Sequence, residues 1–152
     1  SHCASFRLYW MERASLKPSC RAFSNASDVG LDKLMPVMLM GEGMIRLLQI
    51  VLSIAHLPQG ILLIDEIESG LHYSALPNLW QIVASLATEQ DTQVVATTHS
   101  YECIATAAEF FQKEQPEALR VYRLDRGDGS TQVATYDTEL LMTALEVNFE
   151  IR

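Results

Sequence analysis

The sequence has little of what marks several large classes of protein. Its three cysteines, Cys3, Cys20 and Cys103, are far apart and show no Cys-x-x-Cys spacing, which argues against a structural zinc site and against a disulfide framework. The longest apolar runs hold about half of the ~20 residues that a membrane-spanning helix needs. Basic residues are also scarce, with 11 lysines and arginines against 19 acidic residues and a formal net charge of −8. We therefore expect a cytoplasmic protein with reduced thiols, no membrane contact and no direct nucleic-acid binding of its own.

What is present fits one globular core. Hydrophobic residues make up 49% of the 152 residues and charged residues 20%, which is typical of globular domains. Residues 1–36 are the least regular part, with one short β-prone run at 6–10 and a loop-like stretch at 18–32 that is rich in Ser, Asn, Asp and Gly. We treat residues 1–36 as a poorly determined N-terminal segment and assign residues 37–152 to the C-terminal part of one domain.

Helix and strand patterns alternate through residues 37–152. We predict helices at residues 43–56, 73–88, 101–113 and 138–148, the last capped by Thr138, and strands at 61–64, 93–98, 119–124 and 132–136. The first helix is apolar on nearly all sides and the strand at 61–64 is continuously apolar, so we expect both to be fully buried. The predicted fold is α/β, with a mainly parallel sheet flanked by helices and a β-hairpin near its C-terminal end.

The strongest chemical signal is an acidic pair after the apolar run at 61–64. Asp65 and Glu66 stand where the strand leaves the sheet, at the edge where parallel sheets bind their ligands. Asp65 is placed to hold Mg²⁺, because hard cations prefer carboxylate oxygens, and Glu66 is placed to orient or deprotonate an attacking water. The alternative is a strand that simply ends in two solvated acids.

A second polar segment, Thr97-Thr98-His99-Ser100, follows the next predicted strand. Because the two strand ends of a βαβ unit can lie side by side, His99 is expected within reach of a phosphate that the acids would serve. A single histidine after a strand is more often structural. Its combination with Asp65 and Glu66 favours a functional role.

These segments together resemble motifs of ABC-type ATPases. The Walker B motif is matched by ILLIDE at residues 61–66, the switch histidine by His99, the D-loop by SGLH at 69–72, and the signature motif by MGEGMIR at 40–46. The combination is similar to AAA-family ATP-binding proteins of prokaryotes, relatives of the overcoming-lysogenisation-defect and chromosome-maintenance ATPases. The resemblance covers about residues 36–152.

The resemblance implies a P-loop NTPase-like domain that binds ATP and Mg²⁺ and dimerises with ATP between its subunits. It implies that Glu66 and His99 are catalytic, that Asp65 binds the metal, and that nucleotide bound by the partner subunit is contacted from Gly41, Glu42, Gly43, Arg46, Ser69 and Gly70. Gly41 stands where ABC transporters carry a serine, which leaves only the backbone amides of a helix N-terminus for the phosphate. The alternatives are a flexible turn at 41–43 and, for Arg46, a surface charge on the helix.

One motif of the family is absent from the sequence. No Gly-x-x-x-x-Gly-Lys-[Ser/Thr] run occurs, so the chain lacks the amides and the lysine that surround the β-phosphate. In ABC-type domains this loop lies upstream of the signature, and the first 36 residues are too short to hold that part. We expect a C-terminal half-domain, inactive alone, that an N-terminal half with the P-loop completes; the other explanation is a truncated gene product.

Three functional hypotheses follow. The leading one is Mg²⁺-dependent ATP hydrolysis within a larger, homodimeric ATPase that acts beside a nuclease or toxin partner. The alternative is a non-catalytic dimerisation or regulatory remnant of such a domain. A metal-dependent nuclease of the Toprim kind also clusters acids at strand ends, but Asp125-Arg126-Gly127-Asp128 does not supply the acid spacing that its chemistry needs.

Overall fold

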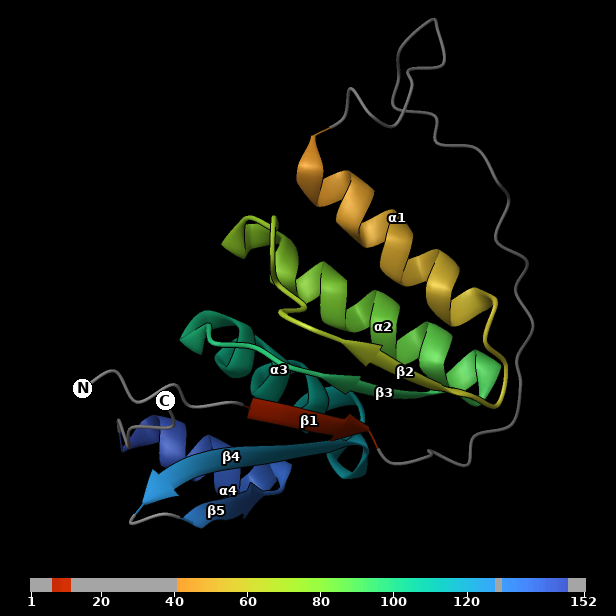
Figure 1. The fold of residues 1–152 in the computed structure, drawn as a ribbon. Helices are drawn as coiled ribbons and strands as arrows, with labels where there is room; N and C mark the ends of the chain where they lie inside the picture. Colours follow the sequence, from red (N-terminus) through yellow and green to blue (C-terminus); the bar gives the residue numbers. More distant parts are fainter. Residues whose placement is uncertain (1–6, 12–40, 128–129, 148–152) are drawn as a thin grey trace, which may run out of the picture.

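A computed structural model describes residues 7–11, 41–127 and 130–147 of the chain. Its elements are β1 (Arg7–Met11), α1 (Glu42–Ala55), β2 (Ile61–Ile64), the 3-10 turn η2 (Tyr73–Ala75), α2 (Leu76–Gln90), β3 (Gln93–Ala96), α3 (Tyr101–Glu114), the 3-10 turn η3 (Pro116–Ala118), β4 (Leu119–Gly127), β5 (Ser130–Tyr136) and α4 (Thr138–Glu146) (Figure 1). Every helix and strand predicted from the sequence is present. The loop predicted at residues 18–32 lies outside the described residues.

The five strands form one sheet in the order β2-β3-β1-β4-β5 (Figure 1). Among the described strands, only β2 and β3 pair in parallel. Strand β1 is antiparallel to both β3 and β4, and β4 and β5 form an antiparallel pair. The prediction of a mainly parallel sheet is therefore wrong, while the C-terminal hairpin is confirmed. The physical reason is that β1 lies between β3 and β4 and runs against both, although β2, β3 and β4 themselves share one direction.

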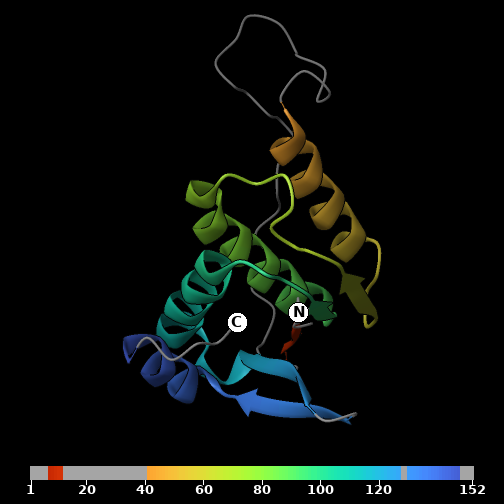
Figure 2. The ribbon, with the colours of Figure 1, turned by 60° about the vertical axis from the view of Figure 1, so that its left-hand side comes forward.

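The described helices gather on one side of this sheet (Figure 2). They form a row in which α1 contacts α2, α2 contacts α3 and α3 contacts α4, and α4 also packs on β4 and β5. The hydrophobic core lies between this row and the sheet. Among the described residues its largest fully buried side chains include Phe111, Ile54, Ile67, Leu79, Ile104 and Leu119.

Strand β2 is buried on one face only, which corrects the expectation of burial on both. Ile64 is buried in the core and Leu62 packs against it, whereas Ile61 and Leu63 are 61% and 75% exposed. The alternation follows from the period of two along a strand, because the helices cover only one side. In the described part of the chain, the outer face of β2 is a bare apolar surface.

Helix α1 is likewise less buried than its composition predicts. Only Ile50 and Ile54 are buried, while Met44, Leu48 and Leu52 are 44%, 38% and 47% exposed. The helix packs on α2 at the end of the row, so one stripe of its apolar surface meets a neighbour. The prediction that it is buried on nearly all sides is wrong.

The starts of the later helices follow local capping chemistry. The Ser100 hydroxyl accepts a hydrogen bond from the Cys103 amide at the start of α3, and the Asp137 carboxylate accepts one from the Leu140 amide at the start of α4. Thr138 is therefore not the cap of α4; its hydroxyl donates instead to the carbonyl of Pro116. None of the helices in residues 41–127 and 130–147 has the length and apolar character needed to cross a membrane.

The one-sided layering predicts unequal costs for two leucine substitutions. Leu79→Ala empties a fully buried position of α2 and is expected to lower the free energy of unfolding by about 2–5 kcal/mol. Leu63→Thr, on the exposed face of β2, is expected to change it by less than about 0.5 kcal/mol. Urea denaturation of the two variants measures both values, and an equal loss at Leu63 would mean that this face is covered.

Candidate functional site

The ends of β2 and β3 lie side by side. The two strands pair in parallel with Ile64 opposite Ala96, so Asp65 and Thr97 leave the sheet together. The Thr97 hydroxyl donates a hydrogen bond to Asp65 Oδ1 and accepts one of 2.9 Å from the Glu66 amide. The Thr97 side chain, directly after β3, thus bonds to both acidic residues that follow β2.

Glu66 adopts a left-handed backbone conformation, with φ of 45°. This conformation is unfavourable for a residue with a Cβ atom and persists only where neighbours hold it. On its N-terminal side the amide is held by Thr97, and on its C-terminal side the carbonyl accepts a 2.9 Å hydrogen bond from the Ser69 amide. The Ile67 amide also donates to the Thr97 carbonyl at 3.0 Å, which ties the turn to β3.

The segment that carries His99 is tied to the same turn through Glu68. The His99 amide donates to Glu68 Oε1 at 3.2 Å, and the His99 side chain is exposed beyond it. His99 therefore stands at the edge that Asp65 and Glu66 occupy, on the neighbouring strand end.

The start of α1 packs against the D-loop-like segment. A Cβ atom on Gly43 would lie 3.1 Å from the Gly70 carbonyl, which is closer than such contacts normally are, so glycine permits the approach. Gly41, at the N-cap, has φ of 91°, a conformation that glycine adopts without strain. The first amides of α1 have no acceptor within the helix, and they lie at the helix start, where α1 meets the D-loop-like segment. Gly41, Glu42, Gly43, Ser69 and Gly70 thus belong to one continuous region.

Arg46 reaches from α1 to residues 65–69 of its own chain, the turn after β2 that we call the acidic turn. Its Nη2 donates to the carbonyls of Asp65 and Glu66 at 2.8 and 3.1 Å. The guanidinium therefore contacts the backbone, and the side chain is half-buried rather than a free surface charge.

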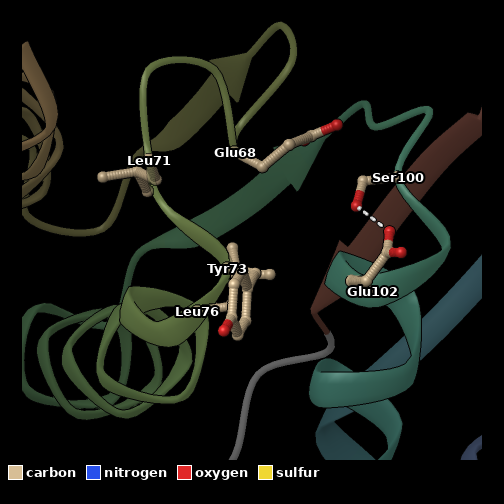
Figure 3. Close-up of a pocket in the computed structure, with 6 residues that line it drawn as sticks. All are labelled: Glu68, Leu71, Tyr73, Leu76, Ser100 and Glu102. Atoms are coloured by element: carbon tan, nitrogen blue, oxygen red, sulfur yellow. Dashed lines mark hydrogen bonds between the residues drawn. The ribbon is translucent and has the colours of Figure 1, made fainter.

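A cleft of about 350 Å³ opens beside the turn, between the D-loop-like segment and the start of α3 (Figure 3). Its polar side is formed by Glu68, Ser100 and Glu102, and its apolar side by Leu71, Tyr73 and Leu76. The Ser100 hydroxyl donates to Glu102 Oε2 at 3.0 Å while it caps α3. These contacts explain the orientation of both side chains by local structure.

Cys103 is buried in the first turn of α3, and its thiol is expected to be unreactive. Burial, and next the charge of Glu68, raise the pKa of its thiol from an ordinary 9.0 to about 12, against the lowering effect of a hydrogen bond with Thr98. A thiol that stays protonated is a poor nucleophile and metal ligand.

The acids of the site suit a magnesium ion shared with phosphate better than a protein-only metal centre. In the described part of the chain, no group of three or more His, Cys, Asp and Glu side chains is placed to hold a metal ion. Mg²⁺ commonly takes one or two carboxylates and completes its shell with waters and substrate phosphates. Asp65, exposed at the strand end, fits that limited role.

Two contributors were not identified from the sequence. The sequence pattern gives no role to Thr97 or Glu68, yet these two side chains join the two strand ends. The signal for Thr97 was its position: on neighbouring parallel strands in this register, Asp65 and Thr97 point to the same face.

Replacing Thr97 tests the junction between the strands. Thr97→Val keeps the shape but leaves the Glu66 amide without its acceptor, so we expect a loss of about 1 kcal/mol in the free energy of unfolding. Thr106→Val, which removes a hydroxyl that bonds only the preceding helical turn, is the matched control and is expected to be near neutral. Urea denaturation gives both values; equal effects would show that the Thr97 hydroxyl contributes nothing specific.

The pKa of Cys103 predicts its reactivity. Because the folded chain favours the neutral thiol, the stabilisation is fully present below pH 9.0 and is lost as the pH rises toward about 12. In a variant with Cys3 and Cys20 replaced by serine, an aromatic disulfide reagent at pH 8 should label Cys103 only as fast as the chain opens. The same variant in urea should react completely at once, and rapid labelling without urea would contradict the burial.

Comparison with known proteins identifies the family. The model of an AAA-domain family described as AbiEii toxin-like, of the type IV toxin–antitoxin system, matches residues 26–105. An uncharacterized protein of Methanocaldococcus jannaschii is 34% identical over 99 residues, which are 65% of this chain and 85% of that protein. No solved structure matches the chain. The chain belongs to the AbiEii toxin-like family of AAA domains and is thereby related to the P-loop ATPases.

Proposed function

We propose that the chain binds ATP with Mg²⁺ and takes part in its hydrolysis within a larger ABC-type ATPase. The observation that carries this proposal is the pairing of two parallel strand ends, in which Thr97 holds the acids Asp65 and Glu66 at one edge. Family membership supports the nucleotide, since AAA ATPases use ATP and Mg²⁺. Three side chains of this edge then take separate roles.

In the proposed reaction, Asp65 holds Mg²⁺ directly or through water and Glu66 serves as the general base. Glu66 would take a proton from the attacking water, a role for which a fixed carboxylate is suited. His99, exposed on the neighbouring strand end, would contact the γ-phosphate and respond to its presence. The metal would supply charge neutralisation on the phosphate oxygens when bound.

We propose that a second copy of the ATPase completes the nucleotide site. The start of α1 (Gly41, Glu42 and Gly43) and the segment Ser69–Gly70 lie against each other, so they offer one surface to a facing subunit. Backbone amides at the helix start would contact the phosphate there. The carboxylate of Glu42 lies in this first turn, so the amides rather than this side chain would face the anion.

The P-loop is proposed to come from a segment outside this sequence. No Gly-x-x-x-x-Gly-Lys-[Ser/Thr] run is present in the sequence. Within the described sheet, β3 lies between β2 and β1, and β1 runs antiparallel to the other two strands. Leu63 is 75% exposed and lies on the same face of β2 as Asp65. A segment that packed on Leu63 would therefore bring its loop next to Asp65. Apolar strands of parallel sheets are normally covered on both faces, which supports a missing layer.

A non-catalytic regulatory or dimerisation module remains the second candidate, and one observation favours it. The 99 matched residues are 85% of the archaeal relative, so the remainder of that protein is shorter than the ~30 residues of a strand–loop–helix unit with its connections. A similar protein that is little longer than the matched region thus exists. The two candidates differ in whether nucleotide binds once a P-loop is supplied.

The family description also supports a biological setting. It names a toxin of a type IV toxin–antitoxin system. We propose that the completed ATPase acts in such a system in the cytoplasm, as part of a toxin or beside a toxin or nuclease partner.

Substitution of Glu66 tests the catalytic proposal. With the P-loop segment supplied as a fusion or separate chain, Glu66→Gln should bind ATP as the parent does and lower kcat by about 10²–10⁴-fold, because the base is removed and the metal ligand stays. Glu89→Gln, on the exposed side of α2, is the matched control and should hydrolyse normally. Phosphate release and filter binding of ATP measure the two quantities, and normal turnover in Glu66→Gln would remove this residue from the mechanism.

Calorimetry separates the two candidate functions. The ATPase proposal predicts Mg²⁺-dependent heat of ATP binding to the chain with the P-loop segment and none to the chain alone. Dimerisation without any nucleotide binding in either sample would favour the regulatory module.

A further inference from the structure

The proposed mechanism gives no role to the contact between Arg46 and the acidic turn. A single nitrogen, Nη2, donates to two consecutive carbonyls, those of Asp65 and Glu66. Hydrogen bonds from a charged donor are stronger than those between neutral groups. The contact connects two parts of the proposed site. One is the start of α1, which is proposed to face the phosphate bound by the other subunit, and the other is the turn that carries the proposed base, Glu66.

The turn needs such a contact because Glu66 is held in the left-handed region. Its amide is fixed by Thr97 and its carbonyl by Ser69 and Arg46. The hydrogen bond from Ser69 closes the turn locally, so it moves with the turn. Arg46, in contrast, comes from a separate helix and sets where the turn lies relative to α1.

The position of Arg46 along α1 places it close to the helix start. Gly43, three residues before Arg46, approaches the Gly70 carbonyl. The helix therefore contacts the D-loop-like segment at Gly43 and the acidic turn through Arg46. A shift of α1 would therefore be transmitted to the backbone of Glu66 through the guanidinium. Arg46 Nε is buried, so the inner part of the guanidinium is packed away from solvent, and within the described part of the chain no acceptor meets this nitrogen.

We infer that Arg46 is a positioning residue that holds the Glu66 carboxylate in place from within the same subunit and couples it to the start of α1. This inference rests on the proposed function for its catalytic meaning, but its structural part does not. It differs from a direct contact of Arg46 with nucleotide in the facing subunit, because the guanidinium is already engaged by backbone carbonyls.

Hydrogen exchange on the 152-residue chain tests the structural part without any nucleotide. In Arg46→Met the amides of Glu66 and Ser69 should exchange about tenfold faster or more, whereas the Gln93 and Thr97 amides, which pair β3 with β2, should keep their parent rates. Arg46→Lys, which keeps the charge but has a shorter reach and no planar guanidinium, should give exchange rates between those of the parent and those of Arg46→Met. Arg123→Met, which breaks an arginine contact with Asp125 on β4, is the matched control and should leave Glu66 and Ser69 unchanged.

Unchanged exchange at Glu66 and Ser69 in a folded Arg46→Met chain would overturn the inference. If Arg46→Met does not fold, Arg46→Gln decides, because its shorter and uncharged side chain does not reproduce the contact with both carbonyls. Parent-like exchange at both amides in a folded Arg46→Gln chain would then overturn the inference.

Kinetics of the ATPase completed by its P-loop segment test the catalytic part. A positioning role predicts that Arg46→Met lowers kcat at least tenfold with an unchanged KM for ATP, and that Arg46→Lys partly restores it. A raised KM with an unchanged kcat would instead mean a direct nucleotide contact and would overturn the inference. If the parent itself shows no hydrolysis, the proposed function fails, while the exchange data still decide whether Arg46 holds the turn.

Discussion

The parallel pairing of β2 with β3 is the constraint on which the site depends. With Ile64 opposite Ala96, the two strands end at the same level of the sheet, and the Thr97 hydroxyl contacts both Asp65 and Glu66. A slip of one residue would turn Thr97 to the other face and separate it from the acids. The core side of the same strands, with Ile64 and Ala96 packed under the helices, makes such a slip costly.

The acidic turn stores strain that its surroundings offset. A non-glycine residue in the left-handed region costs on the order of 1–2 kcal/mol, and Glu66 meets that cost with hydrogen bonds from three different elements. Strained residues concentrate at functional sites because a less favourable backbone can aim a side chain where a relaxed one cannot. Hydrogen bonds connect this turn to α1, to the residue after β3 and to the D-loop-like segment, so three parts of the fold contact each other here.

Local patterns were sufficient to predict the helices and strands and to place Asp65 and Glu66 at a strand end. The apolar run at 61–64 followed by Asp65 and Glu66 predicts a strand end whatever its neighbours, and the helix periods are local as well. Non-local facts were not accessible in this way. The direction and place of β1 depend on which strands it meets, and nothing in a five-residue run specifies that.

The contacts of Arg46 and Thr97 were hidden for the same reason. Their residue types are compatible with a solvated surface, and only the packing of α1 and the register of β3 reveal their partners. The exposure of Leu63 has a different origin, since an apolar run indicates that a strand is suited to burial and does not tell which chain supplies the cover.

The place of β2 at the border of the sheet has a consequence for the behaviour of the chain in concentrated solution. An outermost strand with apolar side chains such as Ile61 and Leu63 invites pairing with strands of other molecules. This strand is only four residues long and is followed at once by two carboxylates, whose mutual repulsion opposes stacking of identical chains. Asp65 and Glu66 therefore oppose association between the exposed β2 strands of neighbouring molecules.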